Sequence, residues 1–131
     1  HPLAGKEVLD PADLQGARVL SLDHRHHFHR QIAEICSETG MELLRDYEGT
    51  SLDSVRQMVG SGIGLAILPE FYIRSEVGGR AGIHVLKVQG WSATRSIAAV
   101  WRAGAAYGEA YAGIASRIQA EARDIANSGE V

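Results

Sequence analysis

The sequence predicts an α/β fold built around a parallel sheet, and three observations lead to this prediction. Short apolar runs of strand length recur between residues 17 and 68. Between these runs, apolar residues repeat every three to four positions, as on one face of a helix. The connections are short, and the resulting β-α-β-α-β order favours parallel strands joined by right-handed crossovers.

The first strand and helix are predicted in residues 17–40. Residues 17–22 form an apolar run that ends at Asp23. The apolar stripe of the helix that follows consists of Phe28, Ile32, Ile35 and Cys36. We expect Gly40 just beyond the end of this helix, because glycine adopts the left-handed conformation without a Cβ clash.

The second helix is predicted between two further strands, at residues 41–47 and 64–68. Thr50 or Ser51 is expected to cap its N-terminus, and Gly60 to end it. Its apolar stripe consists of Leu52, Val55, Met58 and Val59. These elements complete the predicted sheet.

The second half of the chain is organised differently. We expect a loop at residues 75–82, strands at 83–88 and 95–102, and then a long amphipathic helix that runs toward Asn127. The apolar stripe of that helix consists of Tyr107, Tyr111, Ile114, Ile118 and Ile125. No other predicted element is available to cover this stripe, so part of its packing surface is expected to lie outside the chain.

Composition excludes several classes of protein. The 131 residues include 13 Lys+Arg and 16 Asp+Glu, and a net charge of −3 argues against direct DNA binding by this segment. An apolar content of 45% with 22% charged residues argues against disorder. Neither a membrane span nor a signal peptide is apparent. The single cysteine, Cys36, cannot form a disulfide within the chain, so we expect the reducing cytoplasm.

Four histidines follow the first predicted strand: His24, His26, His27 and His29. Imidazoles at short spacing suit zinc, nickel or copper, but no nearby Cys or Glu in helical register completes a tetrahedral set. Loops at the carboxyl ends of parallel strands are where such sheets bind ligands, and histidines there can donate hydrogen bonds to an anion. We therefore predict that this loop contacts a ligand, and we predict no metal or cofactor.

Thr50 and Ser51 follow a strand and precede a helix, where hydroxyls and free backbone N–H groups can hold an anion or a carboxylate. Helix capping alone explains both residues equally well. The glycines of residues 60–64 follow a helix instead of opening one, so they indicate a turn and not a dinucleotide site. No spacing specifies a catalytic triad, and an enzyme is not predicted.

Residues 50–70 resemble the signature run of the effector-binding domain of LysR-type transcriptional regulators. Residues 1–4 and 11–16 resemble the segment that crosses into the second lobe of that domain, and residues 95–102 resemble the strand that crosses back. The resemblance implies a periplasmic-binding-protein-like (type 2) fold. It implies that residues 1–94 form the second lobe and that residues 95–131 form the returning strand and last helix of the first lobe. The winged helix-turn-helix and the first half of lobe one are expected to lie outside this chain.

Within that family, the chain resembles the peroxide-sensing, OxyR-like branch, in which two cysteines form a disulfide on oxidation. By this resemblance His26 matches a histidine of the switch, His27 stands at the reactive cysteine, and Cys36 matches the second cysteine. Imidazole cannot form a sulfenic acid, so the two-cysteine switch cannot operate within this segment. Cys36 remains a redox candidate through another partner, although its place in an apolar stripe favours a buried, inert thiol.

The resemblance implies a regulator that responds to a small molecule or to oxidation. We expect effector contacts from His26, His27, Thr50 and Ser51, with the other wall of the site supplied by the absent lobe. It also implies promoter DNA contacted through an absent N-terminal domain, a homodimer or homotetramer, and no membrane. Two alternatives remain: a lobe of a solute-binding protein, and a metal-binding protein built on the histidine cluster.

Overall fold

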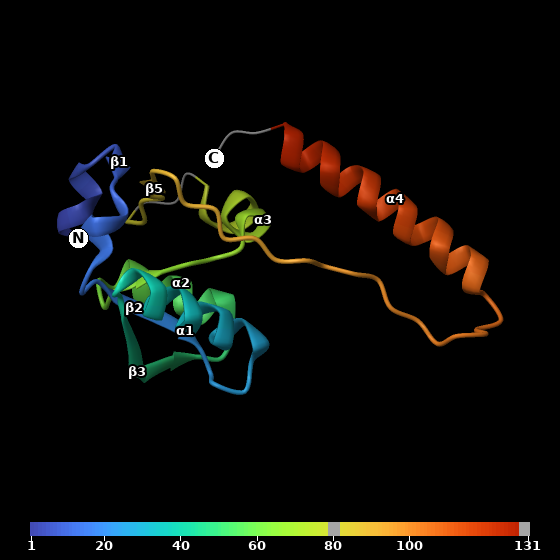
Figure 1. Cartoon of the computed structure of the whole chain (residues 1–131), viewed down its shortest axis with the longest axis horizontal. Coiled ribbons are helices and arrows are strands. Elements are labelled where there is room, and N and C mark those ends of the chain that lie inside the picture. Colours follow the sequence, from blue (N-terminus) through green and yellow to red (C-terminus); the bar gives the residue numbers. More distant parts are fainter. Residues whose placement is uncertain (79–81, 129–131) are drawn as a thin grey trace. The chain divides into compact units, whose positions relative to one another are not determined.

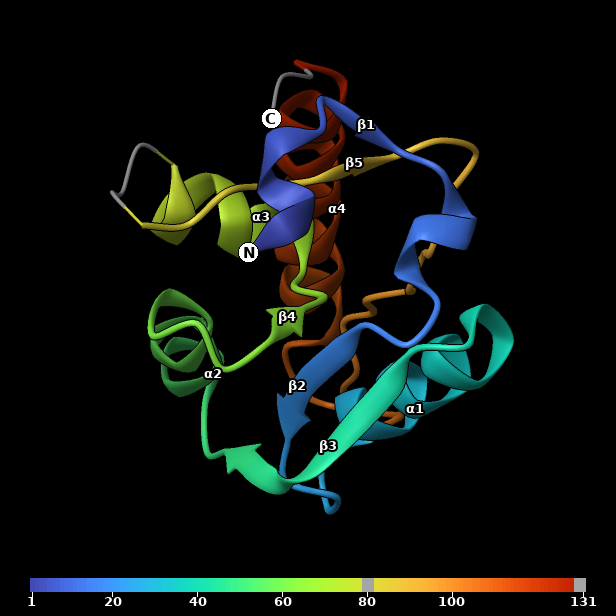
Figure 2. The same cartoon turned by 90° about the vertical axis from the view of Figure 1, so that its left-hand side faces the viewer.

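The computed structural model describes residues 1–78 and 82–128, and the chain divides into two units, His1–Trp91 and Ser92–Val131. The first unit holds a three-stranded sheet with the order β3-β2-β4 (Figure 2). Its strands are β2 (Arg18–Leu22), β3 (Glu42–Gly49) and β4 (Leu65–Ala66), and both neighbours of β2 run parallel to it. The parallel sheet predicted from the alternation of apolar runs and helical stripes is confirmed.

Two helices connect these strands, and their ends agree closely with the predictions. Helix α1 (His27–Thr39) is followed by Gly40, whose φ of 73° is the left-handed conformation expected of a residue that ends a helix. Helix α2 (Leu52–Gly60) begins after Ser51, and Ser51 rather than Thr50 is its N-cap. The helical turn ends at Gly60, with Ser61 as its C-cap.

The two helices pack on opposite faces of the sheet, because successive side chains of β2 point to opposite sides. Val19 belongs to one buried cluster together with Ile32 and Cys36 of α1. Leu20 belongs to the other, together with Val55 of α2. The central strand is therefore covered on both faces, as is usual for a parallel sheet with crossover helices.

The rest of the first unit contains a short two-stranded parallel sheet. β1 (Val8–Leu9) pairs with β5 (Lys87–Val88), and two 3-10 turns, η1 (Pro2–Gly5) and η2 (Pro11–Leu14), flank β1. After β4, α3 (Glu70–Tyr72) continues into a π-helical turn, η3 (Ile73–Val77) (Figure 1). Leu9 and Leu14 join the buried cluster on the α1 side of the sheet.

Several predicted elements differ in the structure. The strand predicted at 64–68 is only two residues long, and the one at 83–88 is reduced to β5. Part of the loop predicted at 75–82 is instead the end of η3, while its residues 79–81 lie outside the described ones. Apolar composition sets where a strand is possible, but the length of a strand depends on how far a neighbour runs beside it.

The strand predicted at residues 95–102 is not formed. These residues have neither helical nor strand structure, and all of them are exposed. A strand requires a hydrogen-bonded neighbour, and the described part of the chain supplies none for this segment. The strand prediction for residues 95–102 is therefore wrong for the described part of the chain.

The second unit contains one long helix, α4 (Gly108–Asn127), as predicted. Its apolar side chains are exposed, with Ile114 at 57% and Ile118 at 63% of their possible surface. Tyr111 meets the ring of Trp101 edge to face, with ring centroids 6.3 Å apart. No helix in the described ranges is both long enough and apolar enough to cross a membrane.

Candidate functional site

The loops that follow β2 and β3 leave the sheet side by side. Leu22 at the end of β2 is the register partner of Gly49 at the end of β3. The backbone N–H of Asp23 then donates to the carbonyl oxygen of Gly49 at 3.0 Å, which joins the two chains just beyond the sheet. The loop after β2 and the Thr50–Ser51 turn therefore start from the same edge, as expected of parallel strands.

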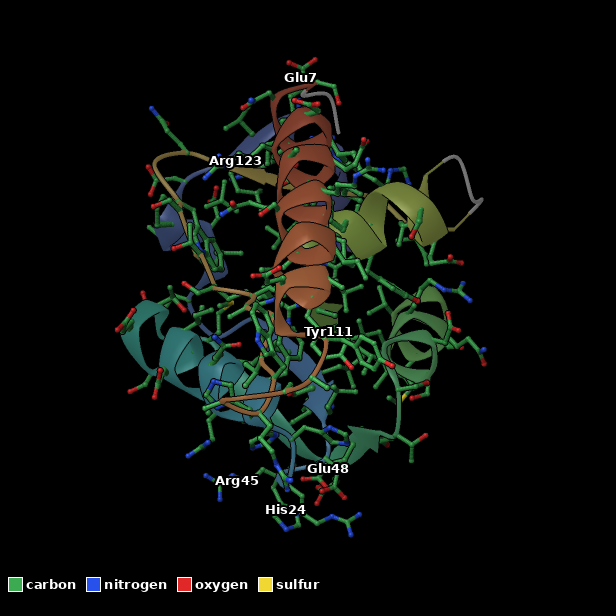
Figure 3. The ribbon with its side chains drawn as sticks, turned by 90° about the vertical axis from the view of Figure 1, so that its right-hand side faces the viewer. Glu7, His24, Arg45, Glu48, Tyr111 and Arg123 are labelled. Carbon is green, nitrogen blue, oxygen red and sulfur yellow. The ribbon has the colours of Figure 1, made fainter. Side chains whose placement is uncertain are left out.

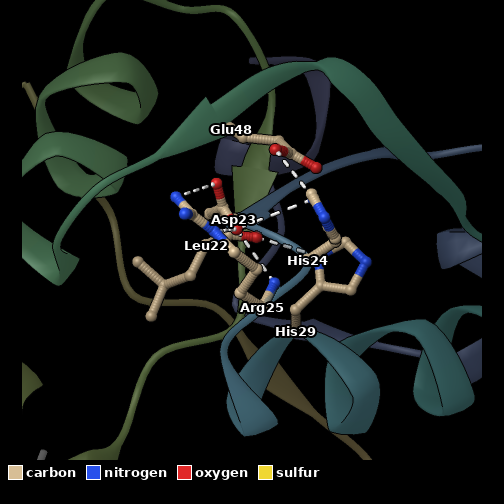
Figure 4. A network of polar contacts seen from close by, with 6 residues as sticks. All are labelled: Leu22, Asp23, His24, Arg25, His29 and Glu48. Carbon is tan, nitrogen blue, oxygen red and sulfur yellow. Dashed lines mark hydrogen bonds and ion pairs between the residues drawn. The ribbon is translucent and has the colours of Figure 1, made fainter.

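Arg25 holds the carboxylate of Asp23 in a fork of hydrogen bonds (Figure 4). The backbone N–H and Nε of Arg25 each donate to Oδ1 of Asp23 at 2.9 Å, and Nη2 donates to Oδ2 at 3.0 Å. These hydrogen bonds, aided by the positive charge, hold the pKa of Asp23 well below its usual range. Asp23 is therefore a carboxylate at any physiological pH.

His24 lies between two carboxylates, one from the loop after β2 and one from β3. Its Nδ1 is 3.6 Å from Oδ1 of Asp23 and 3.7 Å from Oε2 of Glu48. The side chains of His24 and Glu48 lie near one another in the stick view of the chain and in the close-up (Figures 3 and 4). The histidine-rich loop and the end of β3 thus bring together one imidazole, two carboxylates and one guanidinium.

A register shift in β3 brings Glu48 to this position. Val19 pairs with Leu43, but Ser21 pairs with Glu48, so β3 advances five residues while β2 advances two. The three additional residues move Glu48 to the level of the end of β2. Sequence reasoning missed Glu48 because apolar periodicity carries no signal for an irregularity of this kind.

Hydrogen bonds orient the rings of two histidines in the first turn of α1. Nδ1 of His29 lies 2.8 Å from the carbonyl oxygen of Leu22, so this nitrogen carries the proton and donates. Nδ1 of His27 lies 3.0 Å from Nη2 of Arg30, which can only donate, so in His27 the same nitrogen accepts. The exposed ring of His27 consequently offers its other nitrogen as a donor.

The predicted effector residues occupy the turns at the start of the two helices. His26 is the N-cap residue of α1 but makes no side-chain capping bond, and it is exposed. Ser51 forms a reciprocal capping box with Ser54, in which each side chain accepts from the backbone of the other. Thr50 is exposed beside it. All four predicted residues follow the carboxyl ends of β2 and β3.

Cys36 lies elsewhere, inside the cluster between α1 and the sheet. Its side chain is only 3% exposed, and burial raises the pKa of its thiol. Burial in apolar surroundings disfavours the thiolate that reacts with oxidants. The redox candidate is therefore separated from solvent in this structure.

A second concave feature lies at the opposite, amino-terminal edge of the sheet. This open cleft measures about 390 Å³ and lies between the residues that enter β2 and β4, including Arg18 and Gly64, and the N-terminal turn η1. Sequence analysis predicted nothing there. Because ligands in parallel sheets bind beyond the carboxyl ends of the strands, we base no site on this cleft.

Comparison with known proteins gives a consistent family. Residues 1–122 match the LysR substrate binding domain. The chain is 30% identical over 125 residues to a "Hydrogen peroxide-inducible genes activator" of Haemophilus influenzae, an alignment that covers 95% of the chain and 41% of the relative. It is 32% identical over 120 residues to the "DNA-binding transcriptional dual regulator OxyR" of Escherichia coli K12, covering 92% and 39%.

A "Hydrogen peroxide-inducible genes activator" of Pectobacterium carotovorum is 30% identical over 119 residues, covering 91% of the chain and 39% of the relative. The chain thus spans about two fifths of the length of these relatives.

Proposed function

Because this chain belongs to the LysR substrate binding domain family, we propose that it is the effector-sensing part of a LysR-type transcriptional regulator. The family has a periplasmic-binding-protein-like (type 2) α/β fold, and its members are transcriptional regulators rather than enzymes. Promoter DNA would be contacted by sequence outside these 131 residues. The net charge of −3 and the greater length of the relatives support a DNA-binding segment outside these residues.

Residues 1–94 would form the second lobe, and residues 95–131 would belong to the first. The compact core within His1–Trp91 supports the first assignment. The exposed isoleucines of α4 support the second, because a helix with an uncovered apolar face normally packs on another element. The segment at 95–102 would then find its strand partner in the first lobe.

The effector would be a small molecule held at the carboxyl edge of the sheet by His26, His27, Thr50 and Ser51. One observation carries this proposal: the hydrogen bond from Asp23 to Gly49 joins the two loops on which these residues stand. The histidine rings and hydroxyl groups are polar and exposed, and the N-termini of α1 and α2 add positive potential. An anionic or carboxylate-bearing molecule fits these donors.

Effector binding would act on DNA through a change in lobe arrangement. A ligand that binds one arrangement more tightly shifts the population toward it, and the geometry of a homodimer or homotetramer would follow. The regulator would work in the cytoplasm.

The test is the double variant Thr50→Ala with Ser51→Ala in the regulator that contains this chain. We expect loss of the effector response in a band-shift titration on DNA upstream of its own gene, with basal DNA binding retained. An unchanged dose-response would remove these two residues from the site. Failure to shift this DNA under any condition would favour the solute-binding lobe instead.

The names of the relatives favour a second candidate effector, an oxidant. The same band shift, run with reduced and peroxide-treated protein, distinguishes the two. A shift that changes on oxidation and no longer changes in Cys36→Ser would identify a redox regulator. A shift indifferent to peroxide would support the small-molecule effector, in agreement with the burial of Cys36.

A further inference from the structure

Three potential metal ligands converge at the carboxyl edge of the sheet, and the proposed effector contacts do not include them. Asp23, His24 and Glu48 each offer one ligand atom, and these atoms all lie within 4.8 Å of one another. We propose that these three side chains form a binding site for a divalent transition-metal ion, with Zn²⁺ as its representative. The proposal does not rest on the effector site, because metal binding is measured on the chain itself.

The distances suit two ligands of one ion better than they suit hydrogen bonds. The imidazole Nδ1 of His24 lies 3.6 Å and 3.7 Å from the two carboxylate oxygens, beyond the range of an N–H···O bond. Zinc–nitrogen and zinc–oxygen bonds near 2.1 Å at a tetrahedral angle place neighbouring ligand atoms about 3.4 Å apart. The three ligand atoms, all within 4.8 Å of one another, are therefore somewhat farther apart than around a bound ion, and side-chain rotation would have to bring them together.

The backbone holds the three ligands in register before any ion binds. The hydrogen bond from Asp23 to Gly49 joins the loop after β2 to the end of β3, and Ser21 pairs with Glu48 across the same strands. Two of the ligands therefore stand on one side of this junction and Glu48 on the other. Only side-chain torsions remain to be ordered, which lowers the entropic cost of binding.

The charges also favour a divalent cation, with one opposing group. The carboxylates of Asp23 and Glu48 together balance the charge of a divalent ion. Arg25 occupies both acceptor positions of Asp23 Oδ1 and one of Oδ2, so the ion would displace a hydrogen bond of Arg25 or take the remaining position on Oδ2. Arg25 also brings its own positive charge. Arg25 should therefore compete with the ion, and removing its charge should strengthen binding.

The ligand set determines which metals to test. One imidazole and two carboxylates suit zinc and also manganese, and zinc binds such nitrogen and oxygen sites more tightly. Water would complete the coordination, because His24 is 71% exposed. The site differs from a histidine-only cluster, since Asp23 and Glu48 supply carboxylates, and only the fold brings Glu48 to it.

The experiment is a competition titration of the tag-free 131-residue chain with a chromophoric zinc chelator, using Zn²⁺ and then Mn²⁺. We expect one Zn²⁺ per chain, bound more tightly than Mn²⁺. His24→Asn and Glu48→Gln should each weaken Zn²⁺ binding at least about tenfold, as loss of a direct ligand requires. Arg25→Gln should strengthen it several-fold.

The matched control is the double variant His26→Asn with His27→Asn, which keeps the three ligands and should bind within about twofold of wild type. Far-ultraviolet circular dichroism confirms that each variant keeps the fold of the parent chain. Absence of one-to-one binding by the wild type overturns the proposal. So does an equal loss in the control, or an unchanged affinity in Glu48→Gln, because binding would then belong to the histidine-rich loop in general.

Discussion

At the scale of single residues, Gly49 couples the candidate site to the core. Its carbonyl oxygen accepts the hydrogen bond of Asp23 that joins the two loops. A Cβ at this position would overlap Cγ2 of Val55 and lie 2.9 Å from Oγ of Ser54. Glycine is therefore required because α2 lies so close to the end of β3. Gly49 thus takes part both in the junction of the two loops and in the packing of α2.

Gly49→Ala should destabilise the chain by about 1–3 kcal/mol, because a buried methyl group has no room without backbone movement. The free energy of unfolding in urea measures this. Gly5→Ala is the matched control, since a Cβ there meets nothing within 4 Å, and its effect should stay within about 0.5 kcal/mol. Equal stability of the two variants would show that α2 can move away from β3 freely.

Cys36 should react slowly with a thiol reagent in the native chain and rapidly after unfolding, because its thiol is buried and its pKa is raised. The raised pKa also determines how the stability of the fold changes with pH. A thiol whose pKa is higher in the folded state ionises first in the unfolded chain, so its contribution to stability is lost as the pH rises above the ordinary thiol pKa.

The rate of reaction with Ellman's reagent, with and without urea, measures the accessibility of Cys36. Cys36→Ser should remove the reaction in both conditions, since the chain has one cysteine. Rapid modification of the native protein would contradict the burial of Cys36 and would support the hypothesis that the effector is an oxidant.

At the scale of elements, α1 and α2 begin at one edge because β2 and β3 run parallel. Their first turns differ in how they are stabilised. Ser51 and Ser54 cap α2 reciprocally, whereas His26 at the start of α1 makes no capping bond with its side chain. The side chain of His26 is thus not used in helix capping, whereas that of Ser51 is. The histidine side chains are therefore freer to bind a ligand than the hydroxyl of Ser51.

Ser51→Ala should lower the free energy of unfolding by about 1 kcal/mol, the usual cost of losing a helix cap. Thr50→Ala, one residue away and exposed, should change it by less than about 0.5 kcal/mol. Chemical denaturation of the two single variants makes the comparison. Equal effects would mean that the hydroxyl of Ser51 contributes little to α2, and its role would then be sought in ligand contact.

At the scale of the whole molecule, the two buried clusters belong entirely to the first unit. Every residue of both clusters, and every apolar residue packed against them, lies between Leu3 and Trp91. In the second unit, α4 has no buried residue. The burial of apolar surface that drives cooperative folding is therefore concentrated in His1–Trp91.

A fragment of residues 1–91 should unfold with the same midpoint as the complete chain, within a few degrees, because it retains both clusters. Thermal melting followed by circular dichroism tests this. Residues 92–131 alone should melt gradually and without cooperativity, as a single helix without tertiary partners does. A large drop in the midpoint of the 1–91 fragment would mean that the second unit stabilises the first.

The sequence by itself determined the elements whose signals are local. The apolar stripe of Phe28, Ile32, Ile35 and Cys36 predicted α1, and Gly40 predicted its end. Alternating strands and helices predicted a parallel sheet. In such a sheet the loops after neighbouring strands leave from one edge, so the topology also predicted that the effector residues share that edge. Periodicity and turn residues act over a few positions, so the chain carries this information in its order alone.

Only the tertiary structure decided the features that depend on a partner far along the chain. The strand predicted at 95–102 has the right composition but no neighbour to pair with among the residues that the structure describes. The register shift between β2 and β3 brings Glu48 beside His24 and Asp23, although 24 positions separate His24 from Glu48 in sequence. Pairing and register are set by packing of the whole sheet, so no local pattern of residues specifies them.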